Sequence, residues 1–215
     1  MSDFKIGIDY GGTKIEGILI DSNGKEILRK RSTYEKNYES GLNTVKSLVS
    51  EFDKFTDQQN SVGVCIPGFS SYETGLVNNA NCIWINDKPF HKDLEKSLNR
   101  EIRIMNDANC FALSEAIDGS GANYKSVWGV IIGSGFGGSF VYEKKVIEGV
   151  NQIAGDWGHQ PLPYPTQEEI DYNVQCNVGN CKRPLCAEQF ISGIGFTKLF
   201  NEKYGTSLRT REIVA

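Results

Sequence analysis

Of all segments in the sequence, the stretch Ile104-Met105-Asn106-Asp107-Ala108 most strongly limits which folds this chain can adopt. Apolar residues over 101–105 predict a strand, and residues 108–117 predict a helix that begins at once. A strand that feeds directly into a helix is the repeating unit of α/β folds. The turn places the Asp107 carboxylate at a strand end, beside the first amides of a helix. Phosphoryl-transfer sites in α/β proteins put catalytic bases there, and an ordinary helix N-cap is the alternative.

The other elements also indicate an α/β protein. Helices are expected over 39–55 and 90–98, a hairpin over 140–147, and strands over 4–9, 14–20, 26–31, 61–66 and 126–132. The glycine-rich stretch 118–123 is the best linker by composition. The expected domains are therefore 1–118, with the first glycine turn and the candidate base, and 119–215, with the second glycine run and the cysteine segment.

Composition narrows the function classes. The 215 residues are 39% hydrophobic and 23% charged, which suits a globular protein with a substantial core. A net charge of −4 gives no electrostatic footprint for nucleic acid, so a phosphate must be held by local amides or a metal ion. No segment is apolar and long enough to span a bilayer, and the N-terminus lacks a signal peptide's features. A cytoplasmic protein without a membrane partner is expected, with cysteines as thiols or metal ligands.

A glycine turn follows the first expected strand. Gly11 and Gly12 permit a tight turn whose exposed amides reach phosphate oxygens. Thr13 adds a hydroxyl donor, and Asp9 can position Mg²⁺ through water. The alternative is a plain hairpin turn.

A second glycine run follows the strand expected at 126–132, with the sequence Gly133-Ser134-Gly135-Phe136-Gly137-Gly138. It is typical of a second phosphate cradle, although glycine-rich loops are common. No lysine follows in Walker position, and no acidic residue stands at dinucleotide spacing. P-loop and NAD-binding folds are therefore disfavoured.

A histidine and three cysteines gather in the last third of the sequence: His159, Cys176, Cys181 and Cys186. One imidazole and three thiolates complete a tetrahedral zinc set, and a metal with four protein ligands is structural. The alternative is a weak site, or one that uses only some of the thiols. The remaining cysteines, Cys65, Cys82 and Cys110, lie in apolar surroundings and are expected to be buried small hydrophobes.

Together these motifs resemble the ROK family of bacterial sugar kinases, over the whole length. Asp9-Tyr10-Gly11-Gly12-Thr13 matches the family's first phosphate motif. The resemblance implies an α/β, ribonuclease-H-like (actin-like ATPase) sugar kinase fold with two lobes that clamp a nucleotide. ROK kinases continue well past the point that corresponds to Ala215. The second lobe is therefore expected to be incomplete, with the truncation at its C-terminal end.

The resemblance also implies residue roles. Asp107 is the expected general base. The expected sugar ligands are Asn81, Asn106, Asp107, Asp156, His159 and Glu188, and the expected ATP ligands are Asp9, Gly11, Gly12, Thr13, Lys14, Gly133, Ser134, Gly135, Gly137 and Gly138. Two departures stand out. Asp156 replaces the family's glutamate, and the three cysteines are evenly spaced by five positions where the family has a Cys-x-Cys turn.

The expected function is ATP-dependent phosphorylation of a hexose, with Mg²⁺ and a structural Zn²⁺. The stretches 78–86 and 158–163 resemble the fructokinase branch of the family more than its glucokinase branch, which implies fructose, with N-acetylglucosamine or glucose as the alternatives. The alternatives from another functional class are a non-catalytic sugar-binding regulator and an inactive fragment. A purely structural zinc module would leave both glycine runs and Asn106-Asp107 unexplained. The family also favours a homodimer.

Overall fold

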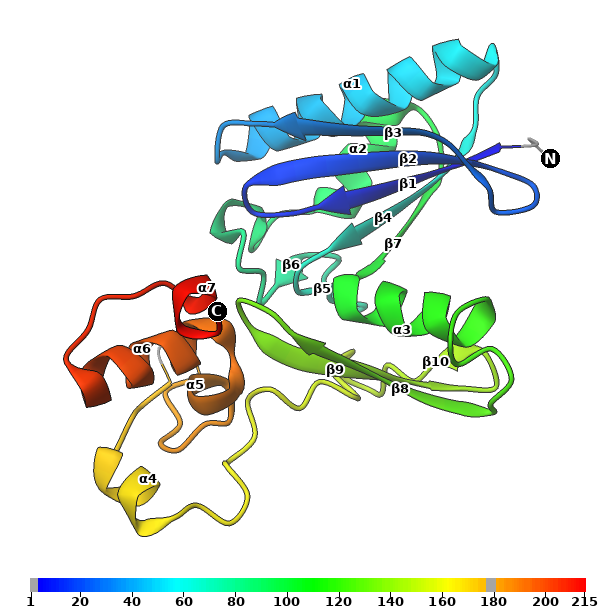
Figure 1. Cartoon of the computed structure of the whole chain (residues 1–215). Coiled ribbons are helices and arrows are strands. Elements are labelled where there is room, and N and C mark those ends of the chain that lie inside the picture. The colour runs from blue at the N-terminus through cyan, green and yellow to red at the C-terminus, as the bar shows by residue number, and fades with distance from the viewer. Residues whose placement is uncertain (1–3, 177–180) are drawn as a thin grey trace. The chain divides into compact units, whose positions relative to one another are not determined.

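A five-stranded mixed sheet forms the centre of the first unit of the protein, residues up to Cys110 (Figure 1). The computed structural model describes residues 4–176 and 181–215. The strands are β1 (Phe4–Tyr10), β2 (Lys14–Asp21), β3 (Glu26–Thr33), β4 (Ser61–Ile66) and β7 (Ile102–Asn106), in the order β3-β2-β1-β4-β7. β1, β2 and β3 pair antiparallel, whereas β4 and β7 continue the sheet in parallel. This is the ribonuclease-H-like order that the resemblance implies.

Helices α1 (Tyr38–Thr56) and α2 (Phe90–Leu98) pack against this sheet and against each other. The Asn37 side chain accepts a hydrogen bond from the Ser40 amide and so caps the start of α1. Apolar residues three and four positions apart give both helices one buried face. The core includes Ile6, Ile8, Val45, Val49, Phe52, Phe90 and Leu94. Three short elements precede α2: β5 (Phe69–Ser70), β6 (Val77–Asn78) and the 3₁₀ turn η1 (Ile83–Ile85).

The second unit begins at Phe111, within α3 (Asp107–Ile117). Its antiparallel sheet has the order β10-β9-β8, from β8 (Ser126–Ile132), β9 (Phe136–Tyr142) and β10 (Lys145–Val146). Ala112 and Ala116 of α3 pack against Val141 of β9. Because most of α3 shares a core with this sheet, the division between the units falls inside the helix, ahead of the 118/119 boundary expected from composition.

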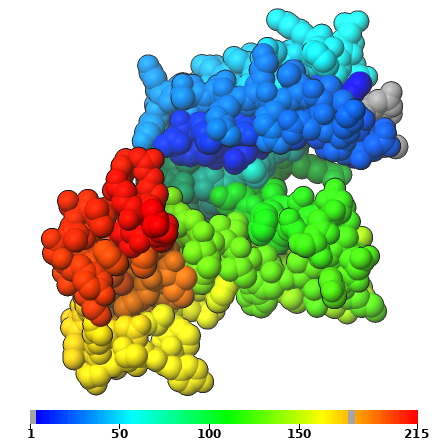
Figure 2. All heavy atoms as spheres, in the orientation of Figure 1, coloured from blue at the N-terminus to red at the C-terminus, as the bar shows by residue number. Residues whose placement is uncertain are grey.

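The rest of the second unit is mostly loop with short helices. These are α4 (Gln167–Tyr172), α5 (Glu188–Ile191), α6 (Gly193–Tyr204) and α7 (Thr210–Ile213). Helices α6 and α7 lie against each other (Figure 1 and Figure 2), and the hydroxyls of Thr197 and Thr210 hydrogen-bond at 2.6 Å. Among the described residues, no helix combines the length and the apolar character that crossing a bilayer requires.

The second glycine run differs from its expected form. β9 begins at Phe136 rather than near 140, so Gly137 and Gly138 lie in a strand, opposite Ile131 and Val130. Only residues 133–135 form the turn. A Cβ at Gly138 would come within 2.5 Å of the Trp157 Nε1 atom and of the Gly129 carbonyl oxygen. Gly138 is therefore a close-approach glycine inside a strand, where no side chain fits.

Candidate functional site

The first unit carries the turn between β1 and β2. The Gly11 amide donates to the Lys14 carbonyl at 3.1 Å, which closes the turn and leaves Gly12 and Thr13 at its tip. The Gly11 carbonyl accepts a hydrogen bond of 2.8 Å from the Tyr34 hydroxyl. Sequence reasoning did not identify Tyr34, because a single tyrosine after a strand carries no local signal.

Asp9 stands near the end of β1, with its side chain exposed. Cys65 lies opposite Asp9 in the parallel pairing of β1 with β4, and its thiol donates to Asp9 Oδ1 at 3.5 Å. This corrects the expectation for the cysteines: Cys82 is fully buried, but Cys65 and Cys110 are only half-buried. The pairing register places Cys65 beside the carboxylate at the end of the strand, rather than in the core.

Asn106 and Asp107 divide two tasks at the junction of β7 and α3. Asn106 Oδ1 accepts a hydrogen bond from the Asn109 amide at 3.2 Å, so Asn106 caps the helix. Its Nδ2 donates to the Gly68 carbonyl at 2.9 Å. Asp107 is the first residue of the helix, and its Oδ1 accepts from the Ala108 amide at 2.8 Å. The N-cap role that the sequence analysis considered for Asp107 is therefore filled by Asn106.

Burial and neighbouring groups, chiefly Ala108 and Asp9, set the pKa of Asp107. Although its outer side is open to solvent, partial burial raises the pKa of its carboxyl group. The hydrogen bond from Ala108 lowers the pKa, and the negative charge of Asp9 raises it again. A carboxylate with a raised pKa accepts a proton more readily, which suits a general base.

Asn81 is exposed between two buried residues, Ala80 and Cys82, in the segment between β6 and η1. The Asn86 side chain holds this segment, because it accepts from the Ala80 amide and donates to the Ala80 carbonyl, both at 2.9 Å. A Cβ built on Gly12 would lie 4.0 Å from Asn81 Oδ1 and 3.5 Å from Cys82 Sγ. The fold therefore brings Asn81 next to the first glycine turn.

In the second unit, two carboxylates lie against the second glycine run. Glu188 is 4% exposed, and its Oε2 accepts a hydrogen bond of 2.8 Å from the Phe136 amide. Its Oε1 would lie 3.2 Å from a Cβ on Gly135. Asp156 Oδ1 accepts from the Gly158 amide at 3.3 Å and would lie 3.3 Å from a Cβ on Gly137.

The turn 133–135 is anchored from its other side by the start of α6. The Gly193 amide donates to the Gly133 carbonyl at 2.8 Å, and the Ile194 amide donates to the Ser134 carbonyl at 3.4 Å. Burial raises the pKa of Glu188, while the Phe136 amide and the nearby His159 oppose that shift. The structure therefore gathers Gly133, Ser134, Gly135, Gly137, Asp156 and Glu188 in one region.

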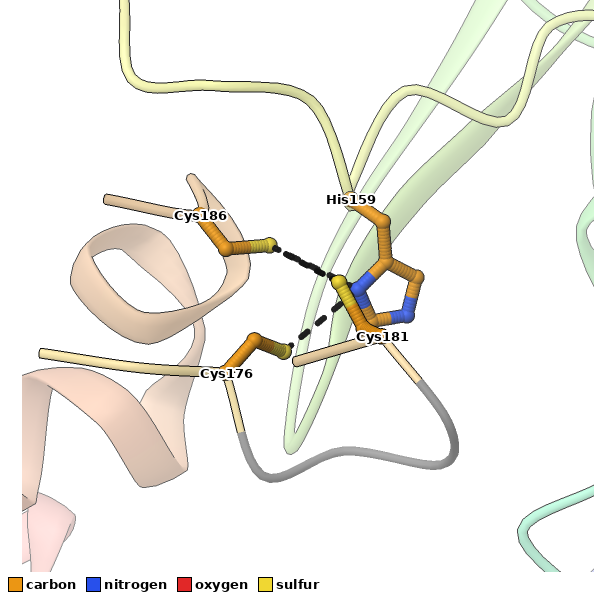
Figure 3. A group of neighbouring side chains, drawn as sticks. All are labelled: His159, Cys176, Cys181 and Cys186. Carbon is orange, nitrogen blue, oxygen red and sulfur yellow. Dashed lines mark hydrogen bonds between the residues drawn. The ribbon is translucent and has the colours of Figure 1, made fainter. Parts of the chain in front are cut away.

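His159, Cys176, Cys181 and Cys186 converge in the same unit, with their ligand atoms within 4.8 Å of one another. Backbone hydrogen bonds bring the cysteine-bearing segments together, because the Cys176 amide donates to the Arg183 carbonyl and the Leu185 amide to the Val174 carbonyl. Figure 3 shows the sulfurs and His159 Nδ1 facing a common centre, with Nε2 directed away from them. The even spacing of the cysteines is thus compatible with a single cluster.

The distances within the cluster can be compared with those of a metal site. Tetrahedral zinc, with Zn–S of about 2.3 Å and Zn–N of about 2.0 Å, places two sulfurs about 3.8 Å apart and sulfur about 3.6 Å from nitrogen. The separations are 3.9 Å between the Cys181 and Cys186 sulfurs, and 3.6 and 3.5 Å from His159 Nδ1 to the Cys176 and Cys186 sulfurs. These three separations match a tetrahedral zinc site, and all four ligand atoms lie within 4.8 Å of one another, so the cluster is compatible with a zinc ion.

Comparisons with known proteins bear on the family and the fold of the chain. The ROK family model matches residues 5–215. The N-acetyl-D-glucosamine kinase of Haemophilus influenzae is 38% identical over 213 residues, which are 97% of this chain and 69% of that protein.

Two solved structures share the fold. The ROK hexokinase from Thermus thermophilus matches with a TM-score of 0.80 at 22% identity, over 97% of this chain and 67% of that protein. A ROK family glucokinase from Streptomyces griseus, in complex with glucose and AMPPNP, matches with a TM-score of 0.75 at 22% identity. The match covers 94% of this chain and 61% of that protein. These matches confirm the ribonuclease-H-like, actin-like ATPase fold. By family match and by sequence identity, the chain belongs to the ROK family.

Proposed function

We propose that this protein is an ATP-dependent N-acetyl-D-glucosamine kinase. The observation that carries the proposal is its 38% identity, over 97% of its length, to a protein of that name. The Pasteurella multocida kinase of the same name gives the same identity over 98% of the length. N-acetylglucosamine, an alternative in the sequence analysis, therefore becomes the first choice, and fructose the second.

Asp107 has the chemistry of the base in this reaction. As a sugar hydroxyl oxygen forms its bond to the γ-phosphorus of ATP, the bond from that phosphorus to the bridging oxygen breaks and ADP leaves. The hydroxyl proton passes to the Asp107 carboxylate, whose raised pKa favours accepting it. Such a base contributes about 10²–10⁴-fold, and positioning and charge neutralisation supply the rest.

The two glycine turns are proposed to bind ATP. The amides of Gly12 and Thr13 stand at the tip of a closed turn, and backbone amides of this kind form anion-binding concavities. The exposed Asp9 carboxylate at the end of β1 suits Mg²⁺, which prefers oxygen ligands and retains waters. Mg²⁺ would neutralise phosphate charge. The proposed ATP-binding set is completed by Lys14, Gly133, Ser134, Gly135, Gly137 and Gly138.

The proposed sugar ligands are Asn81, Asn106, Asp107, Asp156, His159 and Glu188. Asn106 gives Oδ1 to the helix cap and one N–H to Gly68, and its side chain also interacts with the Asp107 carboxylate, so it is proposed to hold the base beside the sugar. Glu188 is held by the Phe136 amide, which orients its other oxygen. The zinc ion proposed at His159 and the three cysteines would be structural, with all four positions filled by protein.

A coupled ADP-release assay tests the proposal. The protein is assayed with N-acetylglucosamine, fructose, glucose and mannose in the presence of ATP and Mg²⁺. We expect kcat/KM for N-acetylglucosamine to exceed that for each other sugar by at least about tenfold, a discrimination equal to about 1.4 kcal/mol. Asp107→Asn is the control for contaminating kinases, because that variant should release no ADP above background. A preference for fructose, or release unaffected by Asp107→Asn, would contradict the proposal.

A further inference from the structure

The carbonyl of Gly11 and the amide of Gly12 belong to one peptide unit. A trans peptide is planar, so its C=O and N–H point in opposite directions. Tyr34 donates its hydroxyl hydrogen to the Gly11 oxygen at 2.8 Å. Whatever holds that oxygen on one side of the turn therefore directs the Gly12 N–H to the other side. Glycine has few conformational restraints of its own, so an external contact is needed to select this orientation.

The position of Tyr34 follows from the register of the hairpin. Lys14 pairs with Thr33, so the next residue in sequence, Tyr34, stands opposite the turn between β1 and β2. Its ring packs on Tyr10, at 5.5 Å between centroids, and on Trp84, at 6.0 Å. These two rings restrict the side chain, which makes its hydroxyl a fixed donor rather than a mobile one.

The two rings that flank Tyr34 are themselves joined by a hydrogen bond. Trp84 Nε1 donates to the Tyr10 hydroxyl oxygen at 3.1 Å, which fixes these two rings relative to each other. Burial raises the pKa of Tyr34, and the neighbouring Tyr10 adds to that shift. Tyr34 is therefore un-ionised at neutral pH and keeps the proton that it donates to Gly11.

The absence of a side chain at Gly41 leaves space for the Tyr10 hydroxyl. Tyr10 is fully buried, and a Cβ at Gly41 of α1 would lie 2.0 Å from its hydroxyl oxygen. Trp84 comes from η1, in the segment that carries Asn81. The same three aromatic residues therefore tie the first glycine turn to the segment of the candidate sugar ligand.

We propose that Tyr34 is a positioning residue for the phosphate-binding turn. Through the Gly11 carbonyl it fixes the Gly12 amide in the orientation that donates to a nucleotide phosphate, and Tyr10 and Trp84 hold it in place. The inference rests on the proposed ATP-dependent function of this turn. It adds a residue outside the glycine motif, which acts through the Gly11 carbonyl.

The test compares two tyrosine variants that each lose one hydroxyl. Tyr34→Phe keeps the ring packing and removes the bond to Gly11. Tyr38→Phe is the matched control, because Tyr38 is also half-buried and donates to Asp93 Oδ2 at 2.7 Å, but joins α1 to α2 instead of the turn. For each variant, KM for ATP, KM for N-acetylglucosamine and kcat are measured, together with the Kd of ADP·Mg²⁺ by calorimetry.

In Tyr34→Phe, KM for ATP and Kd for ADP·Mg²⁺ should rise about three- to tenfold, the range expected for one net hydrogen bond. KM for the sugar should change less than about twofold, and Tyr38→Phe should leave all values within about twofold of wild type. An active wild-type enzyme whose Tyr34→Phe variant matches Tyr38→Phe would overturn this inference and leave the proposed function standing. A wild-type protein that binds no ADP·Mg²⁺ would overturn both.

Discussion

Glu188 accepts a hydrogen bond of 2.8 Å from the backbone amide of Phe136, so the carboxylate that follows the cysteine cluster holds the first residue of β9. Both partners are buried, at 4% and 7% exposure. The Glu188 amide in turn donates to the Gly158 carbonyl at 2.9 Å. One residue thus links the glycine run to the loop that carries Asp156 and His159.

Two substitutions of Glu188 should show how much its hydrogen bond to the Phe136 amide stabilises the protein. Glu188→Ala leaves the buried Phe136 amide without its acceptor, which costs about 1–3 kcal/mol in the free energy of unfolding. Glu188→Gln keeps a carbonyl oxygen that accepts from the amide, so its stability should stay close to that of wild type. Urea denaturation followed by circular dichroism measures both. Equal loss of stability in the two variants would show that the charge, rather than the hydrogen bond, supports β9.

Gly138→Ala should destabilise the second unit. The new methyl group would meet the Gly129 carbonyl oxygen and the Trp157 ring at 2.5 Å, and overpacking of this kind costs about 1–3 kcal/mol. The matched control is Gly133→Ala in the same glycine run, where a Cβ meets nothing within 4 Å. Its free energy of unfolding should change by less than about 0.5 kcal/mol. Similar urea midpoints for the two variants would contradict the close packing of Gly138.

The cysteine cluster should bind about one zinc ion per molecule, as four protein ligands at tetrahedral spacing imply. Elemental analysis of purified protein measures the zinc content. Cys181→Ser removes one ligand and should lower the zinc content and the Tm. Cys65→Ser is the control, because Cys65 contacts Asp9 and lies outside the cluster. Full zinc content in Cys181→Ser would show that this thiol is not a ligand.

Activity should fall on the acid side at a pH above the ordinary aspartate pKa of about 3.9. Burial raises the pKa of Asp107, and the charge of Asp9 raises it further. A base must be ionised to act, so kcat/KM is lost as the pH falls through this raised pKa. Asp9→Asn removes the repelling charge, so the acid limb of its normalised profile should move to lower pH.

The control for this shift is Asp118→Asn, which neutralises an exposed carboxylate just beyond the other end of α3. Its profile should coincide with that of wild type. An acid limb that Asp9→Asn leaves in place, or moves to higher pH, would contradict the electrostatic coupling of Asp9 to Asp107.

The strands and helices were largely predictable from the sequence. Alternating apolar residues in β1 and the three-to-four spacing in α1 are local patterns, and local patterns decide which face of an element is buried. The junction of β7 with α3 was predictable for the same reason, because the strand end, the Asn-Asp pair and the helix are consecutive. The donor types of the cysteine cluster were also evident, since one histidine and three cysteines suit only a few metals.

The structure alone decided how residues distant in sequence meet. It also decided a local question: Asn106 rather than Asp107 caps α3, because Asn106 Oδ1 accepts the hydrogen bond from the Asn109 amide. Gly138 lies in a strand because it pairs with Val130, and it has no room for a side chain because Trp157, from a separate loop, occupies the space above it. Cys65 stands beside Asp9 because two parallel strands pair in that register.

By itself, therefore, the sequence determined the element types, the order of the motifs and the chemistry of the candidate ligands, all of which depend on residues within a few positions of one another. Tertiary structure decided which carbonyl Tyr34 contacts, which amide Glu188 holds and how evenly spaced cysteines form one cluster. Those contacts arise from strand register and side-chain packing, which become defined only when distant segments share a core.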